Sequence, residues 1–200
     1  MPLTHEEGHR SILTHQDIGA ISKPFFNKQG AAYVSGVTDQ TLIALRENNL
    51  PVFTRMYTAG LESDYMLLLR EKSLLSWKEE DYDVLWFEYF ARKMNLIGYY
   101  TMGLFRYNIG IVEEENELKR DIVGHDVYGA IRSLHNPGMA YQRYVDYRDL
   151  LPEERRFANR VGLRSFINLI DPALFFKEFQ LRDNFFYFLF RFIGGVCAAK

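Results

Sequence analysis

Apolar residues recur at helical spacing along most of the chain. Between residues 83 and 105, Val84, Phe87, Ala91 and Met94 repeat every three or four positions, which predicts one face of an α-helix. The same pattern, bounded by capping and helix-ending residues, predicts further helices at about 5–14, 39–48, 61–77, 113–134 and 152–170. The expected fold is therefore mainly α, a helical domain of four to six helices with little strand.

Turn-forming residues separate these helices. The segment 19–37 is rich in glycine, serine, lysine and asparagine, and only 32–34 has strand-like residues, so we expect a loop with at most a short hairpin. Asn49 and Pro51 are expected to end the helix that precedes them. No internal repeat or long linker divides the chain, and residues 1–200 are expected to form a single helical domain.

Composition excludes several classes of function. The 200 residues carry a formal net charge of -2, without the basic excess that is typical of a nucleic-acid-binding surface. The single cysteine, Cys197, can form neither a disulfide framework nor a cysteine-based zinc site. The sequence also contains no phosphate-binding glycine loop and no G-x-S-x-G nucleophile motif. We therefore expect no nucleic acid among the partners.

The C-terminal segment 185–200 is the most apolar part of an aromatic-rich chain. Sixteen phenylalanines and thirteen tyrosines favour either an aromatic core or contact with a lipid interface. The segment is shorter than the roughly 20 residues that a membrane-spanning helix needs. We expect a buried terminal element; the alternatives are an interfacial anchor and the first part of a membrane span cut off at Lys200. Residues 1–5 show no export signal, so the sequence leaves the compartment open, membrane association included.

The candidate for chemistry is the sequence His5-Glu6-Glu7-Gly8-His9, which reads H-E-x-x-H. On a helix, His5 and His9 extend from one face at a spacing that can hold a single zinc ion. Two neutral imidazoles leave the zinc ion its positive charge, which lowers the pKa of a bound water to about 7. The adjacent Glu6 can then act as general base toward that water.

In its H-E-x-G-H form, this motif resembles the active-site helix of the zincin metallopeptidases, over the first dozen residues of the chain. The resemblance implies zinc as cofactor, His5 and His9 as metal ligands, Glu6 as catalytic base, and a peptide or protein as substrate. In that family a strand before the helix holds the substrate in extended form, whereas only four residues precede His5 here. We therefore expect this chain to be the middle or C-terminal part of a longer protein.

A catalytic zinc site needs a third protein ligand. Glu62 is the first candidate, because the helical pattern places it beside Met66 and Leu69 and so partly toward the core. The segment around Glu62 also resembles the helix that supplies a glutamate ligand in the gluzincin group of zincins. Asp64 and His125 are the alternatives.

A second set of possible ligands, Glu117, Asp121 and His125, is spaced four residues apart on the helix predicted over 113–134. Either Asp121 or the nearby Asp126 could accept the free ring N–H of a ligand histidine and thereby orient it. The simpler interpretation of this stretch is a solvated acidic helix face.

Two hypotheses of different kinds follow. The first is a zinc-dependent peptidase that hydrolyses peptide bonds with a zinc-activated water. The second is a non-catalytic helical interaction or membrane-surface module, in which Thr4 and Glu7 form a capping box and the two histidines lie at the surface. They differ in geometry, because the first requires Glu62 or Asp64 within reach of both His5 and His9, whereas the second leaves the histidines facing solvent.

Overall fold

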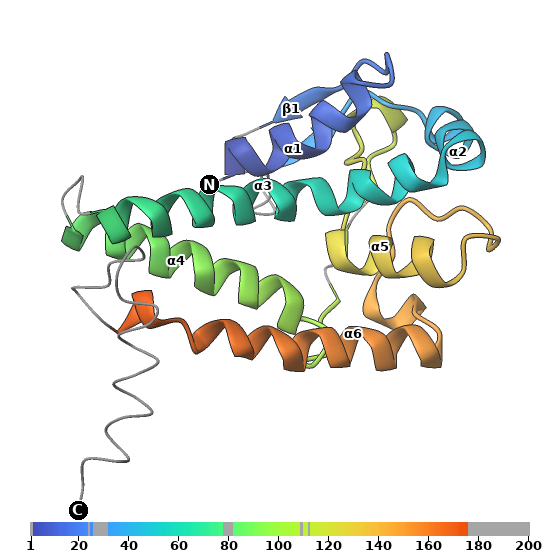
Figure 1. Ribbon diagram of the computed structural model, residues 1–200. Coiled ribbons are helices and arrows are strands. Elements are labelled where there is room, and N and C mark those ends of the chain that lie inside the picture. The colour runs from blue at the N-terminus through green and yellow to red at the C-terminus, as the bar shows by residue number, and fades with distance from the viewer. Residues whose placement is uncertain are drawn as a thin grey trace, which may run out of the picture.

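The computed structural model describes residues 2–23, 25, 32–77, 82–108, 110–111 and 113–175. In this part of the chain, six α-helices and one two-stranded sheet confirm the expected mainly α fold (Figure 1). The α-helices are α1 (Pro2–Thr14), α2 (Asp39–Asn48), α3 (Leu50–Trp77), α4 (Tyr82–Thr101), α5 (Asp126–His135) and α6 (Pro152–Ser165). The shorter elements are β1 (Ile21–Lys23), β2 (Tyr33–Ser35) and the 3-10 helices η1 (Glu117–Lys119), η2 (Tyr147–Asp149), η3 (Phe166–Leu169) and η4 (Pro172–Leu174). The apolar segment 185–200, with Cys197, lies outside the described residues.

The long helix α3 is the centre of the arrangement. It packs against α1, α2, α4 and α5, and α4 in turn packs against α6. Helices α3, α4 and α6 therefore follow one another in tiers (Figure 1). The strands β1 and β2 pair antiparallel, with Ser22 opposite Val34, and this hairpin packs beside α1.

Two apolar clusters form the core, and α3 contributes to both. The first cluster includes Leu13, Val34, Leu42, Met56 and Tyr57. The second cluster includes Leu61, Leu68, Tyr89, Tyr128 and Ala158. Along α3 the first cluster ends at Tyr57 and the second begins at Leu61, so the middle of this helix lies at the junction of the two.

Helix α3 begins at Leu50, and the start predicted at residue 61 is wrong. Pro51 lies in the first turn of the helix, where its missing amide N–H sacrifices no hydrogen bond. The side chain of Asn49 accepts a hydrogen bond from the amide of Val52 (3.3 Å) and so satisfies one of the free N–H groups of that turn. The residues expected to stop one helix therefore also start the next.

The helix predicted over 113–134 forms only in its second half, as α5. Before it the chain runs beside β2, where the amide of Ile122 donates to the carbonyl of Val34 (2.9 Å). Ile122 is fully buried, and Gly124 has a φ of +72°, which ends any helical continuation. The helix face expected to carry three possible ligands four residues apart does not form; these residues are Glu117, Asp121 and His125.

A partly buried carboxylate joins α3, α4 and the C-terminal end of the described chain. Asp171 accepts hydrogen bonds from Lys93, from the hydroxyl of Tyr89 (2.6 Å) and from Lys72 (3.0 Å). Burial on its own would raise the pKa of Asp171, but these donors lower it from 3.8 to about 2. The ionised carboxylate is therefore the form that the fold stabilises.

We predict that Asp171→Ala lowers the free energy of unfolding by about 3 kcal/mol at neutral pH, because it leaves Lys93 buried without its counter-charge. The ion pair contributes fully above pH 3.8 and is lost as the pH falls toward 2, so the difference from the parent chain should shrink in that window. Urea unfolding between pH 6 and pH 3 measures both effects. The control, Glu62→Ala in the exposed Arg55–Glu62 pair, should cost less than about 1 kcal/mol; equal losses in the two variants would contradict the prediction.

Candidate metal centre

The H-E-x-x-H motif lies on α1, which crosses the middle of α3 at very short distance. A Cβ atom at Gly8 would lie 2.5 Å from the carbonyl oxygen of Ala59, so glycine is required for this approach of two backbones. The approach turns the histidine face of α1 inward. His5 and His9 are 6% and 2% exposed, and neither lies at the protein surface.

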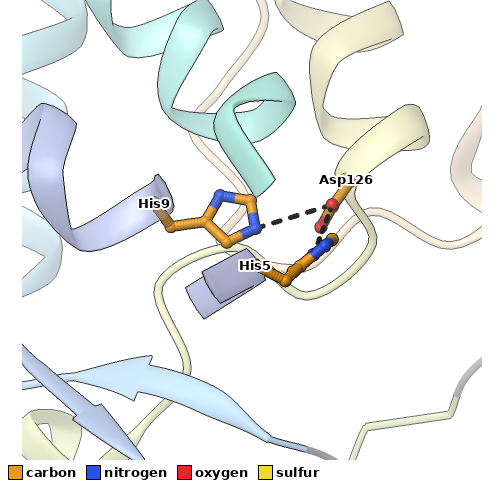
Figure 2. Close-up of side chains that lie close together, drawn as sticks. All are labelled: His5, His9 and Asp126. Carbon is orange, nitrogen blue, oxygen red and sulfur yellow. Dashed lines mark ion pairs between the residues drawn. The ribbon is translucent and has the colours of Figure 1, made fainter. Parts of the chain in front are cut away.

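A third residue, Asp126, meets the two histidines from the first turn of α5 (Figure 2). Its Oδ2 atom lies 3.0 Å from Nε2 of His5 and 3.5 Å from Nε2 of His9. One ligand atom from each residue lies within 4.8 Å of the other two. Ligands bound to one zinc ion at roughly 2.0–2.1 Å in tetrahedral geometry are about 3.3 Å apart. The two distances from Asp126 Oδ2 to the histidine Nε2 atoms, 3.0 Å and 3.5 Å, lie on either side of that value.

The other nitrogen of each imidazole is held by an acceptor. Nδ1 of His5 lies 2.9 Å from Oδ2 of Asp64, and Nδ1 of His9 lies 2.6 Å from the carbonyl oxygen of Met56. An ionised carboxylate and a carbonyl only accept hydrogen bonds, so each Nδ1 carries the hydrogen. In the neutral imidazoles, both Nε2 lone pairs then point toward Asp126, as metal-binding histidines require.

The three converging atoms need a positive charge among them. When both histidines are neutral, Asp126 Oδ2 receives no hydrogen bond and faces two nitrogen lone pairs; a protonated His5 instead donates to it from Nε2 (3.0 Å). Burial on its own would lower the pKa of His5, but the hydrogen bonds and charges of Asp126 and Asp64 raise it to about 10. A divalent cation would satisfy the same negative field, and its binding would displace the ring protons. The donor set, two imidazoles and a carboxylate, therefore fits a metal ion.

Glu6, the acidic residue of the motif, lies within the electrostatic range of this group. It is buried, and burial raises its pKa to about 7. The positive charge of His9 opposes this shift, and the negative charge of Asp121 adds to it. A carboxyl group with a pKa near neutrality exchanges protons readily at pH 7, which is the property that a general base needs.

A further layer of charge lies behind His5. The Oδ1 atom of Asp64 faces Nη1 of Arg92 at 3.9 Å, and neither atom has a hydrogen bond. Arg92 is itself buried and pairs with Glu71 (2.7 Å) and Glu88 (2.8 Å). These contacts connect α1 to α3 and α3 to α4, so the carboxylate that orients His5 is anchored to two other helices.

The structure brings His5 and His9 together with Asp126 and places Glu62 elsewhere. The Glu62 side chain is 46% exposed and binds Arg55 (3.1 Å) and the hydroxyl of Thr58 (2.6 Å). Two residues along a helix correspond to a rotation of about 200°, so Asp64 faces inward where Glu62 faces solvent. The prediction that Glu62 points toward the core is therefore wrong.

The other candidate ligands also have defined places. His125 is buried and stacks on Tyr128, with ring centroids 3.7 Å apart, and burial lowers its pKa to about 4. Asp121 accepts hydrogen bonds from the amides of Val123 (3.3 Å) and Gly124 (3.1 Å). Neither residue belongs to the three-atom group.

The positions of two aspartates differ from those that the sequence pattern predicts. The pattern predicts Asp126 as a residue that orients a histidine and Asp64 as a possible ligand. In the structure, Asp126 lies near both Nε2 atoms, and Asp64 lies near Nδ1 of His5. One local signal favours Asp126, which follows the Gly124-His125 turn as the first residue of a helix. Its distance to the histidines depends on how α5 packs on α3, which periodicity does not reveal.

Comparison of the chain with protein-family models, with curated proteins and with solved structures finds no match. The assignment of the site therefore depends on its geometry and on the chemistry of its residues.

We predict that Gly60→Ala destabilises the protein by about 1–3 kcal/mol, the usual cost of overpacking. A Cβ atom at this position of α3 would lie 2.4 Å from Nε2 of His9 and 2.5 Å from Nε2 of His5. The matched control is Gly98→Ala in α4, where a Cβ would meet nothing within 4 Å, and where alanine should add up to about 1 kcal/mol. Urea unfolding of both variants tests the packing, and a Gly60→Ala variant as stable as the parent would show that the histidines are placed differently.

Proposed function

We propose that this chain is a metal-dependent hydrolase, with one zinc ion held by Nε2 of His5, Nε2 of His9 and the carboxylate of Asp126. The observation that carries the proposal is the convergence of these three atoms, with both Nδ1 atoms held by acceptors. If the histidines served only to balance buried negative charge, their Nε2 atoms would not both have to face the same carboxylate oxygen. Three protein ligands leave the fourth tetrahedral position for water, as in catalytic zinc sites.

The donor set favours zinc over other common metal ions. Imidazole nitrogen suits zinc and other late transition metals, whereas calcium and magnesium prefer oxygen ligands. Two neutral imidazoles and one carboxylate leave a net positive charge on the site. When bound, the zinc ion would supply a Lewis acid that polarises the scissile carbonyl and lowers the pKa of water.

The residues of the chain would supply the remaining steps. The Glu6 carboxylate takes a proton from the attacking water and later delivers it to the leaving amine. In the metal-free chain, burial raises the pKa of Glu6 to about 7. Asp64 accepts the Nδ1 proton of His5 (2.9 Å), and this contact fixes the ring and raises the basicity of Nε2. A peptide bond as the substrate follows from the resemblance of α1 to the zincin helix.

The alternative is a non-catalytic helical interaction module. The exposed apolar side chains of the described chain support this alternative, and Val84 and Phe87 of α4 are examples. In that case the buried histidines would serve only as protonated partners of Asp126 and Asp64. The alternative predicts that the purified chain binds no stoichiometric zinc.

We predict one zinc ion per chain at neutral pH, measured by elemental analysis and by competition with a chelator. His5→Ala, His9→Ala and Asp126→Ala should each abolish stoichiometric binding, because each removes one of only three protein ligands. Glu62→Ala, in which an exposed carboxylate of α3 is lost, is the control and should bind zinc like the parent. Loss of zinc in Glu62→Ala, or none in the parent, would refute the proposed site.

We further predict that Asp64 and Glu6 have different functions: Asp64 supports zinc binding, and Glu6 supports hydrolysis. Asp64→Asn should weaken zinc binding by about 10- to 100-fold, as is typical when a residue that orients a ligand histidine is changed. Glu6→Gln should retain zinc but lower the hydrolysis of fluorescence-quenched casein by about 10²- to 10⁴-fold. A Glu6→Gln variant that keeps both zinc and parental activity would exclude Glu6 as the base.

A further inference from the structure

The outward face of α6 combines positive charge with exposed apolar side chains. Arg156, Arg160 and Arg164 are four residues apart, so they share one side of the helix, and all three are exposed. Large apolar residues are 66–80% exposed within or shortly after this stretch: Leu163, Ile167, Ile170 and Phe175. We call these seven residues the α6 face.

The opposite side of α6 is fixed to the core. Ala158 and Gly162 are buried, and a Cβ atom at Gly162 would lie 2.8 Å from the carbonyl oxygen of Tyr100 in α4. The helix therefore cannot rotate its apolar residues inward without separating two closely packed backbones. The α6 face is exposed because the opposite side of the helix packs against α4. Helix α6 itself runs along the lower edge of the described part of the molecule in Figure 1.

The positive charge of the α6 face is not compensated within the described chain. No carboxylate of these residues pairs with the three arginines of the face. Of the two acidic residues of α6, Glu154 is fully buried and binds Arg132 (2.8 Å), which leaves Glu153 as the exposed one. In a chain whose formal net charge is -2, the positive charge is concentrated locally.

We propose that the α6 face binds the surface of a membrane that contains anionic phospholipids. Such a surface offers negative charge to the arginines and, just below it, an apolar layer for the aliphatic side chains. A nucleic acid would satisfy the arginines but would leave Leu163, Ile167 and Ile170 in water. The combination of both kinds of exposed side chain in α6 and the residues that follow it is what favours lipid.

The mode of binding is a helix lying in the interface plane. None of the described helices is long and apolar enough to cross a bilayer. A helix of 14 residues is roughly 21 Å long, enough to place all three arginines at the level of the headgroups. In the sequence, the apolar segment 185–200 follows soon after the α6 face. The most apolar segment of the chain and the α6 face are therefore both in its C-terminal quarter.

The test is co-sedimentation of the full chain with vesicles of phosphatidylcholine, with and without 30% phosphatidylserine. We expect binding to the anionic vesicles that weakens as salt is raised and that is absent or far weaker with phosphatidylcholine alone. Replacing Arg156, Arg160 and Arg164 together by glutamine should weaken binding by about 5-fold per arginine, hence on the order of 100-fold. Ile167→Asn should also weaken binding to the anionic vesicles, and this loss should be the same at low and at high salt, because it removes an apolar contact and no charge.

The matched control removes three exposed positive charges from other elements, as Lys23→Gln, Arg55→Gln and Lys119→Gln in β1, α3 and η1. This variant should bind anionic vesicles within about 2- to 3-fold of the parent, although its net charge equals that of the arginine variant. Equal binding by the arginine variant and the parent, or equal binding to both kinds of vesicle, would overturn the proposal. Zinc content should be unchanged in every variant, so the two proposals can fail separately.

Discussion

The close contact between α1 and α3 is the constraint on which the rest of the structure depends. At Gly8 a Cβ would overlap the backbone of α3, and at Gly60 it would overlap the two imidazoles. Because both positions are glycine, α1 can press its histidine face into the junction of the two apolar clusters. A larger residue at either position would separate the helices and expose His5 and His9 to water, where their ring nitrogens would have no fixed partners.

Burial then determines the electrostatics of the centre. Taking charged groups out of water is costly unless each has a partner, and the centre holds acidic and basic groups in successive layers. Asp126 faces both histidines, Asp64 holds His5 from behind, and Arg92 lies behind Asp64. This layering holds both imidazoles in one orientation. The site is therefore organised by contacts between four helices, α1, α3, α4 and α5, and by no single motif.

The two proposals describe different surfaces of the molecule. The metal centre is built on α1, α3 and α5, whereas the α6 face belongs to the tier beyond α4. Each proposal has its own observable, zinc content for the first and vesicle binding for the second. If both proposals hold, the chain would be a peptidase that works at a membrane surface, with its membrane-binding residues outside the candidate metal centre.

The sequence by itself determined the helical class and several boundaries, because these depend on local periodicity and capping. The helix expected at 39–48 is α2, and the one expected to start at Pro152 is α6. It also placed His5 and His9 on one face of one helix, because they are four residues apart, and both belong to the three-atom group; the role of Glu6 stays a prediction. Only the tertiary structure brought Asp126 to the two histidines, through the path of the chain along β2 and the packing of α5 on α3. A difference of two positions on one helix likewise separates the exposed Glu62 from the buried Asp64, and helical periodicity alone had assigned that inward face to the wrong residue.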